Sequence, residues 1–227
     1  MQRAAVAWSG GKDSAFALYR ARQRDDITVD SLFTTVSAEY DRVSIHGVRR
    51  ELLQQQADML GLPLETVELP PQYSIGDYNR RMVEHLRQAG NVIDAVVYAD
   101  IFLEDVRQDR EETLQEAGLN GVWPLWGEDT TALAHAVIDE GFEACIVCVD
   151  ADRLDASFAG RWYDKALLAE LPDGVDPCGE TGAFHTFVTD GPVLDAAVPV
   201  TPVDTVTRET DGGEHHYARL AERGEEQ

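Results

Sequence analysis

Cysteine is scarce in this chain of 227 residues. Three cysteines are too few for a disulfide framework, which agrees with a reducing compartment. Cys145 and Cys148 have C-x-x-C spacing, but they lie in the apolar run ACIVCV. A strand would turn their side chains to opposite faces, whereas a metal or redox pair needs a turn. We therefore interpret them as small residues that fill a buried strand.

Long apolar runs are absent as well. No stretch approaches the roughly 20 apolar residues of a membrane span. The N-terminus shows no apolar core of a signal peptide, because its first apolar run stops at a Gly-Gly turn. These observations predict a soluble, cytoplasmic protein with no membrane partner.

Positive charge is the third deficit. The chain has 42 acidic and 19 basic residues, for a formal net charge of -23. Such a surface repels phosphate backbones, which argues against nucleic acid as a partner, and it is typical of halophilic proteins. Lysine occurs only at Lys12 and Lys165, so a lysine inside a glycine turn is conspicuous.

Strands and helices are predicted to alternate along the first half of the chain. Apolar runs predict strands at 4–8, 30–36, 64–69 and 94–101, and amphipathic patterns predict helices at 13–24, 47–61, 76–89 and 104–118. Gly61 and Gly118 are expected to end two of these helices. The alternation predicts an α/β fold with a doubly wound parallel sheet.

The alternation continues beyond residue 127, and the sequence changes character from Pro172. A helix at 129–140, a strand at 144–150 and a helix at 162–171 are followed by Pro- and Gly-rich sequence and a hairpin around Asp211–Gly213. We predict a nucleotide-binding domain at 1–127 and a smaller substrate-binding domain at 128–227.

The most informative stretch is SGGKDS at residues 9–14, between the first strand and the first helix. Glycines let backbone amides point inward, and the helix N-terminus adds free N–H groups and a positive dipole end. Ser9, Ser14 and Lys12 add donors and a charge, which together predict an anion cradle. The stretch is not a common P-loop, because Val6 stands where that motif has its first glycine. An ordinary glycine turn capped by Asp13 is the alternative.

SGGKDS resembles the PP-loop of ATP pyrophosphatases, in the adenine nucleotide α-hydrolase-like superfamily. Residues 31–64, 124–161 and 174–193 resemble the diphthine–ammonia ligase family. The segment YADIFLEDVRQDREE departs from that family and is closer to a shorter offshoot whose substrate is unsettled. The resemblance implies a HUP or Rossmann-like sheet with a smaller α+β C-terminal domain.

The resemblance also implies an ATP-dependent amide ligase. A carboxylate attacks the α-phosphate of ATP, pyrophosphate leaves, and ammonia displaces AMP. The implied cofactors are ATP and Mg²⁺, and the implied partners are ammonia and a carboxylate acceptor, with diphthine on an elongation factor favoured. A homo-oligomer is left open.

The resemblance implies these site residues: Ser9, Gly10, Gly11, Lys12, Asp13, Ser14, Thr34, Thr35, His46 and Asp100 at the nucleotide; Lys12, Asp13, Glu180 and His185 in catalysis; and Asp13 on Mg²⁺. Glu180 and His185 would face the acyl group or ammonia. His185 could instead be a core histidine of an apolar strand.

Glu104, Arg107, Arg110 and Glu111 share one face of the predicted fourth helix. The arginines and Glu104 could bind a carboxylate or phosphate of the substrate, or the face could be an exposed ion-pair network. We expect Trp123 and Trp126 to pack rather than to stack on bases.

Two alternatives to the diphthine reaction stay open. One is the same ATP chemistry on a different carboxylate, and the other is a nucleotide-binding sensor without turnover. We also expect a lysine in a turn to contribute little packing, so that Lys12→Ala would affect activity far more than folding.

Overall fold

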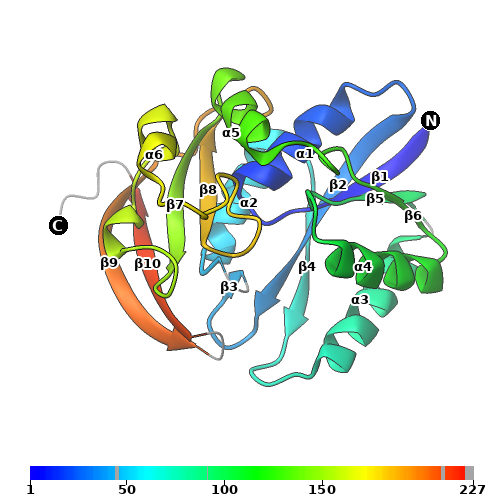
Figure 1. The fold of residues 1–227 in the computed structure, drawn as a ribbon. Coiled ribbons are helices and arrows are strands. Elements are labelled where there is room, and N and C mark those ends of the chain that lie inside the picture. Colours follow the sequence, from blue (N-terminus) through cyan, green and yellow to red (C-terminus); the bar gives the residue numbers. More distant parts are fainter. Residues whose placement is uncertain (44–45, 91, 211–212, 223–227) are drawn as a thin grey trace.

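The computed structural model describes residues 1–43, 46–90, 92–210 and 213–222, which form two sheets with helices packed against them (Figure 1). Residues 211–212 of the predicted hairpin turn lie outside the described residues. The strands on either side of that turn pair antiparallel from Gly213 and Thr210 onward, so the predicted hairpin is confirmed.

Five parallel strands form most of the first sheet, in the order β4-β2-β1-β5-β6. They are β1 (Gln2–Ala7), β2 (Ile27–Ser37), β4 (Leu64–Leu69), β5 (Ala95–Val97) and β6 (Asn120–Val122). A short β3 (Arg42–Val43) pairs antiparallel with the end of β2. This order confirms the predicted doubly wound sheet and places its switch point between β1 and β5, where open α/β sheets bind ligands.

Helices cover both faces of this sheet (Figure 1). Ala4 and Val6 of β1 share one core with α1 (Lys12–Arg22) and α2 (Arg50–Leu60), whereas Ala5 shares a second core with α3 (Ile75–Ala89) and α4 (Glu104–Ala117). The alternation along β1 is the reason, because successive strand residues face opposite sides.

Two glycines end helices as predicted. Gly61 follows α2 with φ of 65° and Gly118 follows α4 with φ of 75°, both in the left-handed region that other residues avoid. The sequence pattern therefore located these helix ends correctly.

The second sheet is antiparallel throughout, in the order β8-β7-β10-β9. Its strands are β7 (Glu143–Asp150), β8 (Phe184–Asp190), β9 (Val200–Thr210) and β10 (Gly213–Glu222), accompanied by α5 (Thr130–Asp139), a 3-10 helix (Ala156–Phe158) and α6 (Lys165–Glu170). This is the predicted α+β part of the chain. The helix expected at 162–171 begins later because Asp164 caps it, accepting a hydrogen bond from the Leu167 N–H at 2.7 Å. The division of the chain at residue 127 stays a prediction.

One hydrophobic core joins the two sheets. It contains residues of β1, α1 and α2 together with residues of β7 and β8. Phe16 of α1 packs edge-to-face on Phe142, which precedes β7, with ring centroids 5.6 Å apart. The helices α1 and α2 therefore lie between the sheets, and the second sheet comes close to the start of α1.

Cys145 and Cys148 are buried on β7 and are free thiols. Burial raises the pKa of each to about 12, which leaves them protonated and unreactive. Among the described residues there is no group of three or more His, Cys, Asp or Glu that could hold a metal ion. The interpretation as buried strand residues is confirmed.

Over the part of the chain that the structure describes, no helix has the length and apolar character needed to cross a membrane. The cytoplasmic location stays a prediction.

Candidate functional site

The glycine turn lies at the carboxyl edge of the first sheet, where β1 ends and α1 begins. Gly10 has φ of +79°, and Gly11 is the N-cap residue of α1 without a side-chain cap. The Ser9 hydroxyl lies 3.2 Å from the Ser14 hydroxyl and accepts from the Gly11 N–H at 3.3 Å. The predicted phosphate-binding residues 9–14 therefore form one compact turn at the N-terminus of a helix.

Strand β8 of the second sheet holds this turn. The Lys12 N–H donates to Thr186 Oγ1 at 3.0 Å, and the Val188 N–H donates to the Gly10 carbonyl at 2.9 Å. A Cβ on Gly11 would lie 3.0 Å from the Thr186 carbonyl oxygen, so glycine there allows β8 to come this close. Sequence reasoning missed Thr186, since nothing in its pattern pairs it with a turn 174 positions away.

Gln56 of α2 is the second residue that sequence reasoning missed. It is fully buried, donates to the Gly10 carbonyl at 3.0 Å and to the Val188 carbonyl at 2.7 Å, and accepts from the Trp8 indole at 2.9 Å. A Cβ on Gly10 would lie 2.9 Å from its Oε1. One amide therefore joins α2, the turn and β8.

The Lys12 side chain is buried rather than free in the turn. It is 1% exposed; its Nζ donates to both carboxylate oxygens of Asp13 at 2.9 Å and to the Cys178 carbonyl at 2.5 Å. The rings of Tyr163 and Phe184 lie 5.1 and 5.5 Å from the ammonium. The expectation that this lysine contributes little packing is wrong.

Burial alone would lower the pKa of Lys12, but the charges around it, chiefly Asp13, outweigh burial and raise it. The lysine is therefore a fixed positive charge at the carboxyl edge of the first sheet.

Glu180 lies in the loop before β8 and bonds to the segment that follows β5. Its Oε1 accepts from the Ile101 N–H at 2.8 Å, while its own N–H donates to Asp176 at 2.7 Å. Burial, with smaller contributions from Asp13 and Asp100, raises the pKa of Glu180 to about 7. A carboxyl group that changes protonation near neutrality thus lies in the same charge network as Lys12.

Asp100 lies three residues beyond β5, because that strand ends at Val97 rather than at the predicted residue 101. It accepts from Arg110 at 3.1 Å and from the Trp123 indole at 3.2 Å, and Arg110 Nε lies 2.8 Å from its Oδ2. Arg110 also lies over the Tyr98 ring, 4.3 Å from its centroid. Both carboxylate oxygens of Asp100 therefore have partners within the chain.

The predicted face of α4 makes contacts of its own. Arg107 lies 4.6 Å from the Trp123 centroid and 4.5 Å from the Trp126 centroid, and it pairs with Glu111 at 2.8 Å. Glu104 is exposed in the first turn of α4. The arginine contacts fit the ion-pair interpretation, and a role in substrate binding stays a prediction for Glu104, Arg107 and Arg110.

The rings of His46 and His185 are in contact, with centroids 4.3 Å apart and planes tilted by 33°. Burial and the charge of Lys12 lower the pKa of His46 to about 4, and burial with His46 and Lys12 lowers the pKa of His185 well below its usual value. Both imidazoles are therefore neutral at pH 7, and His46 Nδ1 is buried without a hydrogen-bond partner. His46, predicted at the nucleotide, and His185, predicted at the acyl group or as a core histidine, therefore lie together, and both roles stay predictions.

Thr34 and Thr35 lie in the carboxyl half of β2, opposite Thr66 and Val67 of β4. The residue before them, Phe33, accepts from the Trp8 N–H at 2.7 Å, just before the glycine turn. The structure therefore brings both threonines to the edge of the sheet that carries the turn.

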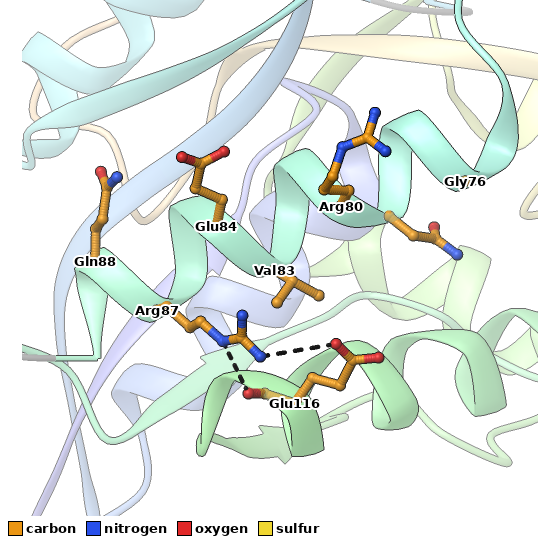
Figure 2. Close-up of a pocket in the computed structure, with 8 residues that line it drawn as sticks. Gly76, Arg80, Val83, Glu84, Arg87, Gln88 and Glu116 are labelled. Carbon is orange, nitrogen blue, oxygen red and sulfur yellow. Dashed lines mark hydrogen bonds and ion pairs between the residues drawn. The ribbon is translucent and has the colours of Figure 1, made fainter.

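A groove of about 690 Å³ lies elsewhere, along α3, where Arg87 bonds to Glu116 of α4 (Figure 2). None of the predicted site residues lines it. We therefore place the candidate site at the glycine turn, where charged groups of both sheets converge, and not in this groove.

Comparison with known proteins gives a consistent result. Residues 2–121 match the diphthamide synthase N-terminal domain, and residues 129–219 match the diphthamide synthase C-terminal domain. The chain is 26% identical to the diphthine–ammonia ligase of Danio rerio over 89% of this chain and 88% of the relative. It is 25% identical to that of Bos taurus, over 92% and 86%.

The diphthine–ammonia ligase of Schizosaccharomyces pombe is 23% identical, over 93% of this chain and 38% of its own length. Among solved structures, a predicted subunit of tRNA methyltransferase from Methanocaldococcus jannaschii aligns with a TM-score of 0.44 and 15% identity, over 83% of this chain and 96% of that one. The two domain matches, which together cover most of the chain, confirm the predicted family. The relatives named diphthine–ammonia ligase confirm the prediction of a ligase enzyme. The chain belongs to the diphthamide synthase family.

Proposed function

We propose that this chain is an ATP-dependent amide ligase that converts diphthine on an elongation factor to its amide. The observation that carries the proposal is the loop at residues 176–182. Through the Cys178 carbonyl this loop holds the Lys12 ammonium, and through Glu180 it reaches the end of β5. A fixed cation and a carboxyl with a pKa near 7 are thereby brought to the switch point of the parallel sheet.

The chemistry follows from these groups. The substrate carboxylate attacks the α-phosphorus of ATP, and pyrophosphate leaves as the acyl-adenylate forms. Negative charge grows on the leaving pyrophosphate, and Lys12 with the N–H groups of residues 9–14 would stabilise it. Ammonia then attacks the acyl carbon, the bond to AMP breaks, and one proton leaves the nitrogen. We propose Glu180 as the base for that proton and neutral His185 as a contact of the acyl group.

The remaining predicted residues have supporting places in the proposal. Thr34, Thr35 and His46 would line the nucleotide beside the turn, and Asp100 would orient it from the end of β5. Arg107 and Arg110 are paired with Glu111 and Asp100. They would bind the acceptor only by contacting it in addition to these carboxylates.

The turn suits ATP, because a helix N-terminus and two serine hydroxyls converge there, next to the buried charge of Lys12. Mg²⁺ would enter with the phosphates and offset their charge. Asp13 is its candidate ligand, and both of its oxygens are now bonded to Lys12.

The test is a product assay in molar KCl with Mg²⁺, α-labelled ATP, ammonium and the diphthine-bearing elongation factor. AMP and pyrophosphate that appear only with the factor would support the proposal. AMP without the factor would keep the ATP chemistry but contradict diphthine as the acceptor. ADP as the product, or ATP that binds and is never cleaved, would contradict the ligase mechanism.

A further inference from the structure

Helix α1, like α2 and α4, has no hydrogen bond to the side chain of its own N-cap residue. In α3, α5 and α6 the N-cap side chains of Ser74, Asp129 and Asp164 accept hydrogen bonds from their own first turns. The N-cap residue of α1 is Gly11, which has no side chain to do so. An oxygen from another part of the chain takes that place, namely Thr186 Oγ1 on β8, at 3.0 Å from the Lys12 nitrogen.

Gly11 and Thr186 are complementary. A Cβ on residue 11 would lie 3.0 Å from the Thr186 carbonyl and 3.3 Å from its hydroxyl, so a Ser or Asp cap at residue 11 would push β8 away. An acidic cap would also oppose an incoming anion. The neutral hydroxyl of Thr186 occupies one N–H and leaves those of Asp13 and Ser14 without carbonyl partners in the helix.

Thr186 also connects the glycine turn to the part of the chain that carries Glu180 and His185. It follows His185 directly in β8, and the same strand begins just after the loop that carries Glu180. Because the side chain of Thr186 is 2% exposed, the surrounding packing holds its hydroxyl in one orientation. A shift of β8 would move the turn, His185 and Glu180 relative to one another.

We infer that Thr186 is a positioning residue for the nucleotide reaction, whose hydroxyl caps α1 from the second sheet and fixes the phosphate-binding turn against the strand that carries His185. This inference rests on the proposed function. It assigns to the second sheet a direct part in shaping the ATP site, in addition to holding the acceptor.

The chain offers a matched control on the same strand. Thr189 is 1% exposed, and its hydroxyl donates to the Glu143 carbonyl of β7 at 3.3 Å. Thr186→Val and Thr189→Val each remove one buried hydroxyl at nearly constant shape, but only the first removes the cap of α1. Thr186→Ser restores the hydroxyl.

The experiment measures the ATP dependence of AMP formation for the full chain and its variants, with thermal melting alongside. A hydrogen bond of about 1 kcal/mol corresponds to roughly a fivefold effect, so Thr186→Val should lower kcat/KM for ATP about five- to tenfold. Thr186→Ser and Thr189→Val should stay within about twofold of the wild type, although Thr189→Val loses comparable thermal stability.

Equal kcat/KM losses in the two valine variants would overturn the inference and leave Thr186 a structural residue. Unchanged kinetics in Thr186→Val would overturn it as well. Wild-type protein that makes no AMP would instead contradict the proposed function, so the two failures are distinguishable.

Discussion

Replacing Gln56 by leucine removes the amide that joins α2, the glycine turn and β8. Three hydrogen bonds are lost, from the Trp8 indole and to the carbonyls of Gly10 and Val188. The Gly10 carbonyl keeps the Val188 N–H as a partner, so it stays satisfied. The Trp8 N–H and the Val188 carbonyl lose the side chain that bonded them.

The magnitude follows from these losses. A buried donor left unsatisfied costs about 1 to 3 kcal/mol, and each neutral hydrogen bond contributes about 1 kcal/mol. We expect Gln56→Leu to lower the free energy of unfolding by about 2 to 4 kcal/mol, or the melting temperature by roughly 5 to 15 °C for a chain of this size.

The assay is denaturant unfolding at constant KCl, with Gln54→Leu as the control. Gln54 lies on the same helix but is exposed, and its side-chain amide donates to Asp58 at 2.9 Å. That variant should change stability by less than about 0.5 kcal/mol. Similar small effects for the two variants would refute the view that one amide ties the turn to the second sheet.

Three further predictions concern charged groups. Lys12→Ala should abolish AMP formation and also lower the melting temperature, because Asp13 loses its partner. The control Lys165→Ala, on the surface, should change neither. An unchanged melting temperature for Lys12→Ala would contradict the burial of Lys12 described above. The pKa of Glu180 is about 7 in the folded chain, and its usual value is 4.5. At pH values between these two, the folded chain therefore keeps a proton that the unfolded chain releases. The free energy of unfolding should therefore fall as pH rises from about 4.5 to about 7. Urea unfolding of Glu180→Gln at the same pH values should not show this fall. If the variant and the wild type depend on pH in the same way, the raised pKa of Glu180 is excluded. Asp100→Asn should lower the free energy of unfolding by about 1 to 3 kcal/mol, because Arg110 loses its charged partner. If chemical denaturation shows no such loss, the Asp100–Arg110 pair does not contribute to stability.

Local sequence patterns predicted much of the fold. The strand and helix periods located β1, β2, β4 and the first four helices, and glycines marked the ends of α2 and α4. Short elements were missed, because the three residues of β6 and two of β3 are too few to carry a period. The antiparallel pairing of β7 could not be read from its apolar run, since such a run does not say which neighbours it pairs with.

The site shows the same limit. The turn at residues 9–14 was evident from its own residues, whereas Glu180 was named through the family resemblance. The burial of Lys12 was not evident, because the carbonyl and rings around it come from residues 163–184. Three glutamines in a row, at 54–56, likewise gave no sign that one of them bonds the turn. Long-range partners decide these roles, and they become visible only when the chain is folded.

The central claim is that the acceptor carboxylate attacks the α-phosphorus of ATP. It is tested most directly by labelling that carboxylate with oxygen-18 on the diphthine-bearing factor and measuring where the label goes. An acyl-adenylate requires one labelled oxygen to leave in AMP when ammonia forms the amide. We predict labelled AMP and unlabelled pyrophosphate by mass spectrometry. Label in inorganic phosphate, together with ADP, would show attack at the γ-phosphorus and contradict the account.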